Sequence, residues 1–152
     1  IDAYNLLITM ECCISGAYIF KGMDGCIKDI SGIHGTYHKV LETPQAIDII
    51  AQSLEKLKIQ KCIWRIDAPV SNSGRLKQLL MNKATEHVQN WEIIIEKNPD
   101  ASLSQSKNIV ISSDSIILNR CERWFNLIDY ILEKLYQPTH FIDFIGDIKI
   151  NS

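Results

Sequence analysis

The sequence has 152 residues, of which 46% are hydrophobic and 22% charged, so it can form one domain with a buried core and is too apolar for a disordered chain. Its formal net charge of −2 gives no support for a basic surface that binds along nucleic acid. The charge does not exclude a nuclease, because a catalytic domain can carry acids at its centre and bases only at its rim. No apolar run of about 18 residues and no signal peptide is present, so we expect a soluble, cytoplasmic protein without a membrane partner.

Helices are predicted where apolar residues recur at the spacing of one helical face. The first covers residues 5–20, and the next begins at Thr43 and Pro44, with Thr43 as N-cap and the proline in the first turn. A third helix is expected at about 73–88 and a long fourth from 115 to about 135. The glycine-rich segment 21–43 is expected to be a long loop with short pieces of structure.

Strands are predicted at short apolar runs bounded by turn residues, namely 61–66, 91–96, 108–113 and 139–145. Strands and helices alternate, which predicts a single α/β domain over residues 1–152, with three layers: a mostly parallel sheet and helices on both of its faces. Asp2 is expected to end a further strand, most of which would precede Ile1. We therefore expect the chain to be a fragment that lacks an N-terminal segment.

Four aspartates follow the predicted strands: Asp2, Asp67 and Asp114 stand at strand ends, and Asp100 lies in the loop after 91–96. Ligands of open α/β sheets bind beyond the carboxyl ends of the strands. Several carboxylates crowded there repel one another, and Mg²⁺ or Mn²⁺ with oxygen ligands relieves that repulsion. Such a site suits metal-assisted phosphodiester hydrolysis.

Each of these aspartates also has an ordinary structural interpretation. Asp-Ala-Pro at 67–69, Asn-Pro-Asp at 98–100 and Ser-Asp-Ser at 113–115 are all common turn or helix-cap sequences. The set of four on alternating strands favours the site over the caps, because strand exits are where sites collect.

A phosphate-binding turn is a second hypothesis. Ser71 and Ser73 lead into the predicted helix at 73–88, and Arg75 and Lys77 add positive charge to its first turn. The free N–H groups and the dipole of a helix N-terminus favour phosphate, although a plain Ser/Asn cap explains the same residues equally well.

The glycine-rich segment holds further polar candidates. Asp24, Asp29, His34, Tyr37 and His38 lie in a predicted loop between two helices, a common place for binding residues. A surface or capping role is the competing interpretation for its histidines.

The segments around the first and the last of these four aspartates, Asp2 and Asp114, resemble a known nuclease pattern. I-D-A-Y-N-L at 1–6 resembles the D-G-x-N-L signature of the NYN branch of PIN-like nucleases, and I-S-S-D-S at 111–115 resembles their S-x-D-S element. The run from Asp2 through 22–25 to 32–37 is similar to an uncharacterised archaeal family, domain of unknown function 434, over most of the chain.

The resemblance implies a PIN/NYN-like fold in which Asp2 and Asp114 are metal ligands and Asn5 helps to orient them. Asp67 and Asp100 match the pattern less closely. Many members carry another acid where this chain has Ile116, and that difference weakens the implied metal affinity.

The function predicted from the sequence is a Mg²⁺- or Mn²⁺-dependent nuclease or phosphodiesterase that acts on RNA, with Asp2, Asp67 and Asp114 catalytic and Asp100 a fourth ligand. One alternative is a non-catalytic RNA- or nucleotide-binding module that uses Asn5, Ser71, Ser73, Arg75 and Lys77. Another is a structural domain that needs its missing N-terminal segment, a second chain or a homo-oligomer.

Overall fold

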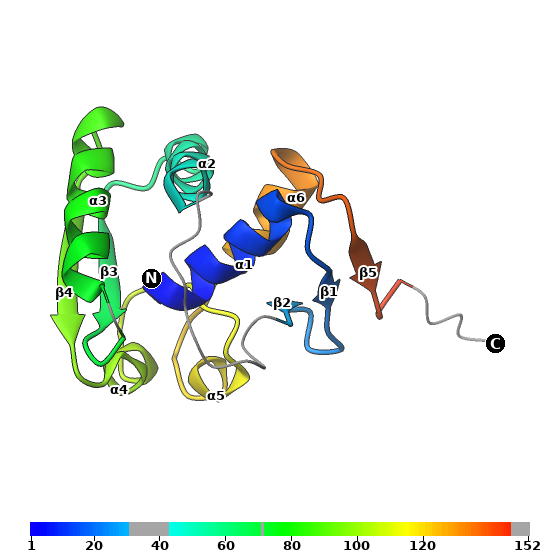
Figure 1. The fold of residues 1–152 in the computed structure, drawn as a ribbon. Helices are drawn as coiled ribbons and strands as arrows, with labels where there is room; N and C mark the ends of the chain where they lie inside the picture. The colour runs from blue at the N-terminus through cyan, green and yellow to red at the C-terminus, as the bar shows by residue number, and fades with distance from the viewer. Residues whose placement is uncertain (31–42, 71, 147–152) are drawn as a thin grey trace.

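Two small sheets and a helix between them form the framework of residues 1–30, 43–70 and 72–146, the part of the chain that the computed structural model describes (Figure 1). β3 (Cys62–Asp67) and β4 (Trp91–Glu96) pair in parallel, with Cys62 opposite Trp91 and Asp67 opposite Glu96. The second sheet has the order β2-β1-β5 and contains β1 (Ile19–Lys21), β2 (Ile27–Asp29) and β5 (Phe141–Asp143). The overall class is α/β.

The predicted three-layer architecture with one mostly parallel, PIN-like sheet is wrong. The strands fall into two separate sheets, and the second is mixed: β1 pairs antiparallel with β2 and parallel with β5. The segment predicted as the strand 108–113 contributes only an isolated bridge from Val110 to Trp124. The strand predicted at 139–145 shortens to β5 and joins the other sheet. Alternation of elements along a chain does not specify which strands share a sheet, because partners are chosen by long-range packing.

Helix α1 (Ala3–Ser15) lies between the two sheets (Figure 1). Its side chains Leu6, Leu7, Met10 and Cys13 are buried at helical spacing, as the apolar stripe predicts. The helix ends at Gly16, whose φ of 76° is a left-handed C-cap conformation that glycine adopts without strain. The predicted helix at 5–20 is therefore shorter and starts earlier, which leaves Ile19 free to begin β1.

The other long helices follow their predicted stripes. α2 (Thr43–Lys56) buries Ala46, Ile47, Ile50 and Leu54, and α3 (Ser73–Glu86) buries Leu76, Leu80 and Ala84. Thr43, predicted as an N-cap, instead belongs to the helix and donates its hydroxyl to the Glu11 carboxylate. Both helices pack on one core cluster that also contains side chains of α1, β1, β2, β3 and β4.

The predicted long helix at 115–135 is wrong. The structure divides it into α5 (Ser115–Leu118) and α6 (Leu127–Lys134), because the main chain around Trp124 pairs with Val110 instead. The apolar residues whose spacing suggested one helix belong to two separate hydrophobic clusters. Ile117 packs with Leu103 and Val110, whereas Ile131 packs in the main cluster.

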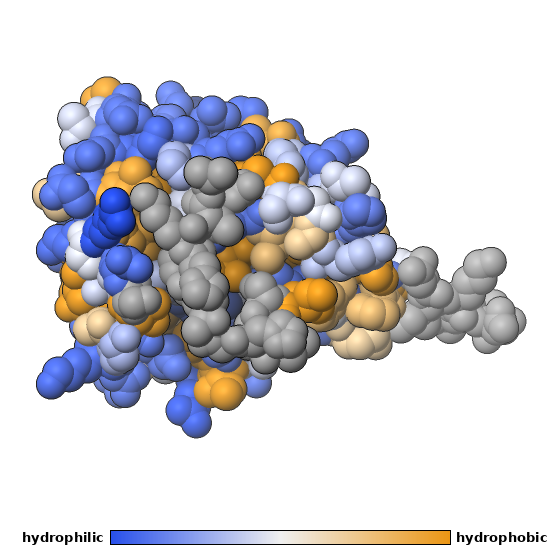
Figure 2. All heavy atoms as spheres, in the orientation of Figure 1, coloured by the Kyte–Doolittle hydropathy of each residue, from blue (hydrophilic) through white to orange (hydrophobic). Residues whose placement is uncertain are grey.

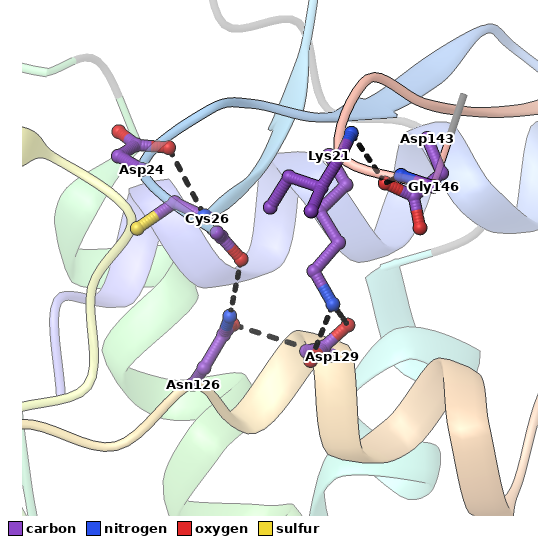
Figure 3. A network of polar contacts seen from close by, with 9 residues as sticks. Lys21, Asp24, Cys26, Asn126, Asp129, Asp143 and Gly146 are labelled. Atoms are coloured by element: carbon purple, nitrogen blue, oxygen red, sulfur yellow. Dashed lines mark hydrogen bonds and ion pairs between the residues drawn. The ribbon is translucent and has the colours of Figure 1, made fainter. Parts of the chain in front are cut away.

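A polar network ties α6 to the β1–β2 hairpin (Figure 3). Lys21 of β1 donates to both carboxylate oxygens of Asp129, at 2.9 and 3.0 Å, and the Asn126 side-chain amide donates to the Gly25 carbonyl at 2.8 Å. Asp24 accepts the Cys26 amide at 3.0 Å within the hairpin turn. Part of the predicted loop 21–43 is thus an ordered hairpin.

Apolar side chains remain at the surface beside β5. Phe141, Ile142, Phe144 and Ile145 are each 40–48% exposed, and Figure 2 shows hydrophobic spheres at this end of the molecule. Among the described strands, β5 lies at the edge of its sheet and pairs only with β1.

Within residues 1–30, 43–70 and 72–146, no helix combines the length and apolarity that a membrane span requires.

Candidate functional site

The first two residues are inserted between β3 and the segment 110–111. The nitrogen of Ile1 donates to the Ile63 carbonyl at 2.7 Å, and the Arg65 amide donates to the Ile1 carbonyl at 2.9 Å. On the other side, the Asp2 amide donates to the Ile111 carbonyl at 2.9 Å. These hydrogen bonds place Asp2 beside the carboxyl end of β3 and beside the segment that leads to Asp114.

The Asp2 carboxyl group is enclosed by protein. Its oxygen Oδ2 accepts a hydrogen bond of 2.8 Å from the hydroxyl of the buried Ser112. Burial raises the pKa of Asp2 to about 6, although the Ser112 hydrogen bond opposes that shift. Asp2 therefore changes its charge near neutral pH, where an ordinary aspartate stays ionised.

A side-chain network joins the start of α1 to the start of α5. The Asn5 oxygen Oδ1 accepts the Ser113 amide at 2.7 Å and the Ser113 hydroxyl at 3.0 Å. The Ser112 hydroxyl oxygen accepts the Asp114 amide at 3.1 Å, and Asp114 Oδ1 caps α5 by accepting the Ile116 amide at 2.7 Å. Asn5 and Ser112 therefore link the start of α1, which carries Asp2, to the turn that carries Asp114.

Asp67 and Asp100 complete the acidic set. Asp67 ends β3, and its oxygen Oδ1 is buried without a hydrogen-bond partner in the part of the chain that the structure describes. Asp100 lies on the surface of α4 (Pro99–Ser104), and its pKa is raised by burial and then by the charges of Asp114 and Asp67. The charge of Asp100 in turn helps to raise the pKa of Asp2. Asp100 therefore lies close enough to each of the other three predicted aspartates for their negative charges to repel.

The carboxyl groups do not form a finished metal site. Among the described residues, no three His, Cys, Asp or Glu side chains stand in a group that could hold a metal ion. A cation would have to draw the side chains together, and Asp100, on the solvent-exposed face of α4, has room to move. The orphaned oxygen of Asp67 is the feature that fits a cation best, because a buried carboxylate oxygen needs a partner.

Sequence reasoning missed a further acid at this edge. Glu96 ends β4 opposite Asp67, accepts Arg65 Nη1 at 2.7 Å through Oε1, and accepts the Ser102 hydroxyl at 2.8 Å through Oε2. The rule that singled out Asp67, an acid at a strand end, applies equally to Glu96. Because Ser102 belongs to α4, Glu96 also fastens the helix that carries Asp100.

The predicted phosphate-binding turn is only partly described. Ser71 lies outside the described residues, Ser73 and Lys77 are half-buried, and Arg75 is exposed on α3. Asn72 precedes α3 with a φ of 69° and makes no side-chain cap hydrogen bond. Neither Arg75 nor Lys77 is among the causes of the raised pKa of Asp2 or Asp100.

The structure describes only some of the polar candidates in the glycine-rich segment. Asp24 is bound by Lys28 at 2.9 Å and the Cys26 amide, and Asp29 accepts the Thr9 hydroxyl at 2.9 Å. Both have structural roles in the hairpin. His34, Tyr37 and His38 lie outside the described residues.

Comparison with known proteins identifies the family. Residues 1–130 match the family described as Domain of unknown function (DUF5616). The chain belongs to DUF5616. A relative of this DUF5616 chain, the uncharacterized protein MJ0935 of Methanocaldococcus jannaschii, is 30% identical over 135 residues, which are 89% of the chain and 64% of the relative. The chain thus spans less than two thirds of that relative. No solved structure matches it.

The family match corrects the resemblance drawn from short motifs. The family is DUF5616, and neither the domain of unknown function 434 nor the PIN/NYN-type nucleases are supported. Asp2 stands at the N-cap position of α1, and Asp114 caps α5. Short aspartate motifs of this kind recur wherever a helix begins, and for that reason they do not identify a family.

Proposed function

We propose that this DUF5616 chain is a divalent-cation-dependent phosphodiesterase that acts on RNA, with Asp2, Asp67, Asp100 and Asp114 at its centre. The observation that supports it is the repulsion between Asp100 and each of the other three carboxyl groups, which come from separate parts of the chain. A fold tolerates such repulsion at a site whose ligand removes it.

The chain's own residues support this role in two ways. Ser112 and Asn5 fix the positions of Asp2 and the turn before Asp114, so two carboxylates keep a constant orientation. Asp67 offers a buried oxygen that has no hydrogen-bond partner among the described residues, and Asp100 supplies a solvent-exposed fourth carboxylate. Bound Mg²⁺ or Mn²⁺ would supply an activated water and stabilise the charge of the phosphate.

A Mn²⁺ titration beside an RNA-cleavage assay tests the proposal. We expect Mn²⁺ to raise the melting temperature of the parent chain and to support cleavage of a single-stranded RNA. Asp114→Asn keeps the cap on α5, since Asn is also a good N-cap, but it should abolish both effects because it removes a negative charge.

Asp143→Asn is the matched control, because Asp143 likewise accepts the backbone amide two residues ahead, at 2.9 Å, but lies on β5. It should cleave and bind Mn²⁺ like the parent. If the parent shows neither a Mn²⁺-dependent stabilisation nor cleavage, the phosphodiesterase proposal fails.

A non-catalytic RNA- or nucleotide-binding module is the second candidate, and the lack of a preformed metal group among the described residues favours it. In that case RNA binding would depend on Arg75 and Lys77 at the start of α3 and would not require Mn²⁺. Binding that survives EDTA, is lost in Arg75→Gln and is kept in Asp114→Asn would decide for this candidate.

A further inference from the structure

A cavity of about 570 Å³ lies between the end of α2, the first half of β3 and the segments 106–111 and 123–125. Its apolar wall includes Leu54 of α2, Leu57 just after that helix, Ile63 of β3 and Val110. This volume falls within the range of small-molecule sites, roughly 300–1,000 Å³. The cavity and the acidic set have no aspartate in common, so it is separate from the site proposed above.

Three basic residues, Lys61, Arg65 and Arg123, line this cavity, and among the residues that the structure describes no Asp or Glu does. Two of its cations are neutralised from outside the cavity: Lys61 pairs with Glu92 and Arg65 with Glu96, each at 2.7 Å. Arg123 differs, because its Nη2 donates to the neutral Lys107 carbonyl at 2.7 Å. Among the described residues no carboxylate forms an ion pair with Arg123, so its charge is available to an anion.

Three large apolar side chains at the cavity are left open to solvent. Ile59 is 45% exposed, Ile109 is 55% exposed and Trp124, next to Arg123, is 43% exposed. Apolar surface gathered around one cavity gains free energy when another apolar body covers it. The indole of Trp124 and the side chain of Arg123 both line the cavity, so an apolar packing surface and a positive charge face the same space.

We infer that this cavity binds a small amphipathic carboxylate. The apolar body of the ligand packs against Leu57, Ile109 and Trp124, and its carboxylate pairs with Arg123. The sign of the charge follows from the unbalanced cation, and the apolar body follows from the wall. An Arg–carboxylate pair at the mouth of an apolar cavity gives specificity for the charged head as well as affinity.

Isothermal titration calorimetry with octanoate and with octanol, its uncharged counterpart, tests this inference. We expect octanoate to bind the parent about tenfold more tightly than octanol, a difference typical of one charged hydrogen-bonded contact. Arg123→Gln should bring octanoate down to the affinity of octanol without changing octanol itself. Arg120→Gln is the matched control, since Arg120 is an exposed arginine three residues away that does not line the cavity.

Ile109→Asp places a negative charge in the wall and should weaken both ligands, and its exposed position allows the variant to fold. Absence of binding, equal affinity for the two ligands, or equal effects of the two arginine substitutions would overturn the inference. Sedimentation supplies a further check: a parent dimer that Ile109→Asp converts to a monomer would show that a second copy occupies the cavity instead.

Discussion

At Asp2, burial in the fold disfavours the ionised carboxylate that the proposed metal site needs. Its position before α1 and its hydrogen bond from Ser112 both favour the ionised form. Burial outweighs them, since the pKa of Asp2 rises to about 6 from an ordinary value of 3.8. At neutral pH the folded chain therefore carries a buried charge that costs stability.

The pH dependence of stability should report this cost. Below about pH 4, Asp2 is protonated in both the folded and the unfolded chain and contributes nothing to the pH dependence. Between pH 4 and 6 the folded chain holds the extra proton, so its stability falls as the pH rises, and above pH 6 the whole loss is present. We expect Asp2→Asn to raise the free energy of unfolding by on the order of 2 kcal/mol at pH 8 and to have little effect at pH 3.5.

Urea unfolding at the two pH values measures the effect. Ser112→Ala serves as the opposite control: it removes the hydrogen bond to charged Asp2, and we expect it to destabilise the fold at pH 8 by about 1.5 kcal/mol or more. An Asp2→Asn gain that is the same at both pH values would show that burial of the charge is not its cause.

At the scale of elements, α4 depends on the β3–β4 sheet for its position. The helix has only six residues. Its N-cap is Asn98, whose side-chain oxygen accepts the Ala101 amide at 3.1 Å, and Ser102 of the helix donates its hydroxyl to Glu96. A helix this short gains little stability from its own hydrogen bonds. Glu96 and Arg65 thus hold the element that brings Asp100 to the acidic set.

Glu96→Gln should loosen α4 selectively. The half-buried Arg65 would lose its ionic partner, and we expect a loss of about 1 kcal/mol with faster hydrogen exchange at the α4 amides. Glu92→Gln is the control on the same strand, because the Glu92–Lys61 pair is exposed and contributes little. Equal exchange rates for α4 in both variants would mean that Glu96 does not position the helix.

The Lys21–Asp129 pair joins α6 to the second sheet and is accessible to a double-mutant cycle (Figure 3). Its two hydrogen bonds and partial burial should give a coupling energy of about 0.5–1 kcal/mol between Lys21→Met and Asp129→Asn. Salt screens a surface pair, so the coupling should shrink in concentrated NaCl. A coupling energy near zero in dilute buffer would show that α6 is held against the second sheet by its apolar side chains alone.

At the scale of the whole molecule, α1 joins the two sheets through one shared core cluster. The core cluster contains Ile19 and Ile27 from the second sheet and Trp64 and Ile93 from the first, with Leu7 and Met10 of α1 among them. A contiguous core of this kind predicts that both sheets unfold together.

Leu7→Ala tests that coupling, since Leu7 is fully buried in α1. We expect the free energy of unfolding to fall by about 2–5 kcal/mol, with a single transition for both sheets. Tryptophan fluorescence follows the first sheet through Trp64 and Trp91, and hydrogen exchange at Ile19 and Ile27 follows the second. Two separate midpoints would show that the sheets are independent.

Prediction from the sequence succeeded where structure is local. The stripes of α2 and α3 and the apolar runs of β3 and β4 lie within single segments, and their elements follow within a few residues. The same method failed at 115–135, where pairing between Val110 and Trp124 interrupts a helical pattern. The strand-end rule was applied to Asp67 but not to Glu96, which ends β4 in the same way and whose contacts with Arg65 and Ser102 only the structure shows.

The sequence by itself determined the segments that form α2, α3, β3 and β4, because the burial of one apolar face leaves a periodic spacing of apolar residues within each segment. It also placed the acids next to element ends. Only the tertiary structure decided that Ile1 and Asp2 lie between β3 and 110–111, that the strands divide into two sheets, and that Arg123 lines a cavity in which no described residue is an acid. The physical reason is that these contacts join groups far apart in the chain, such as Ser112 and Asp2, 110 residues apart, and local periodicity carries no record of them.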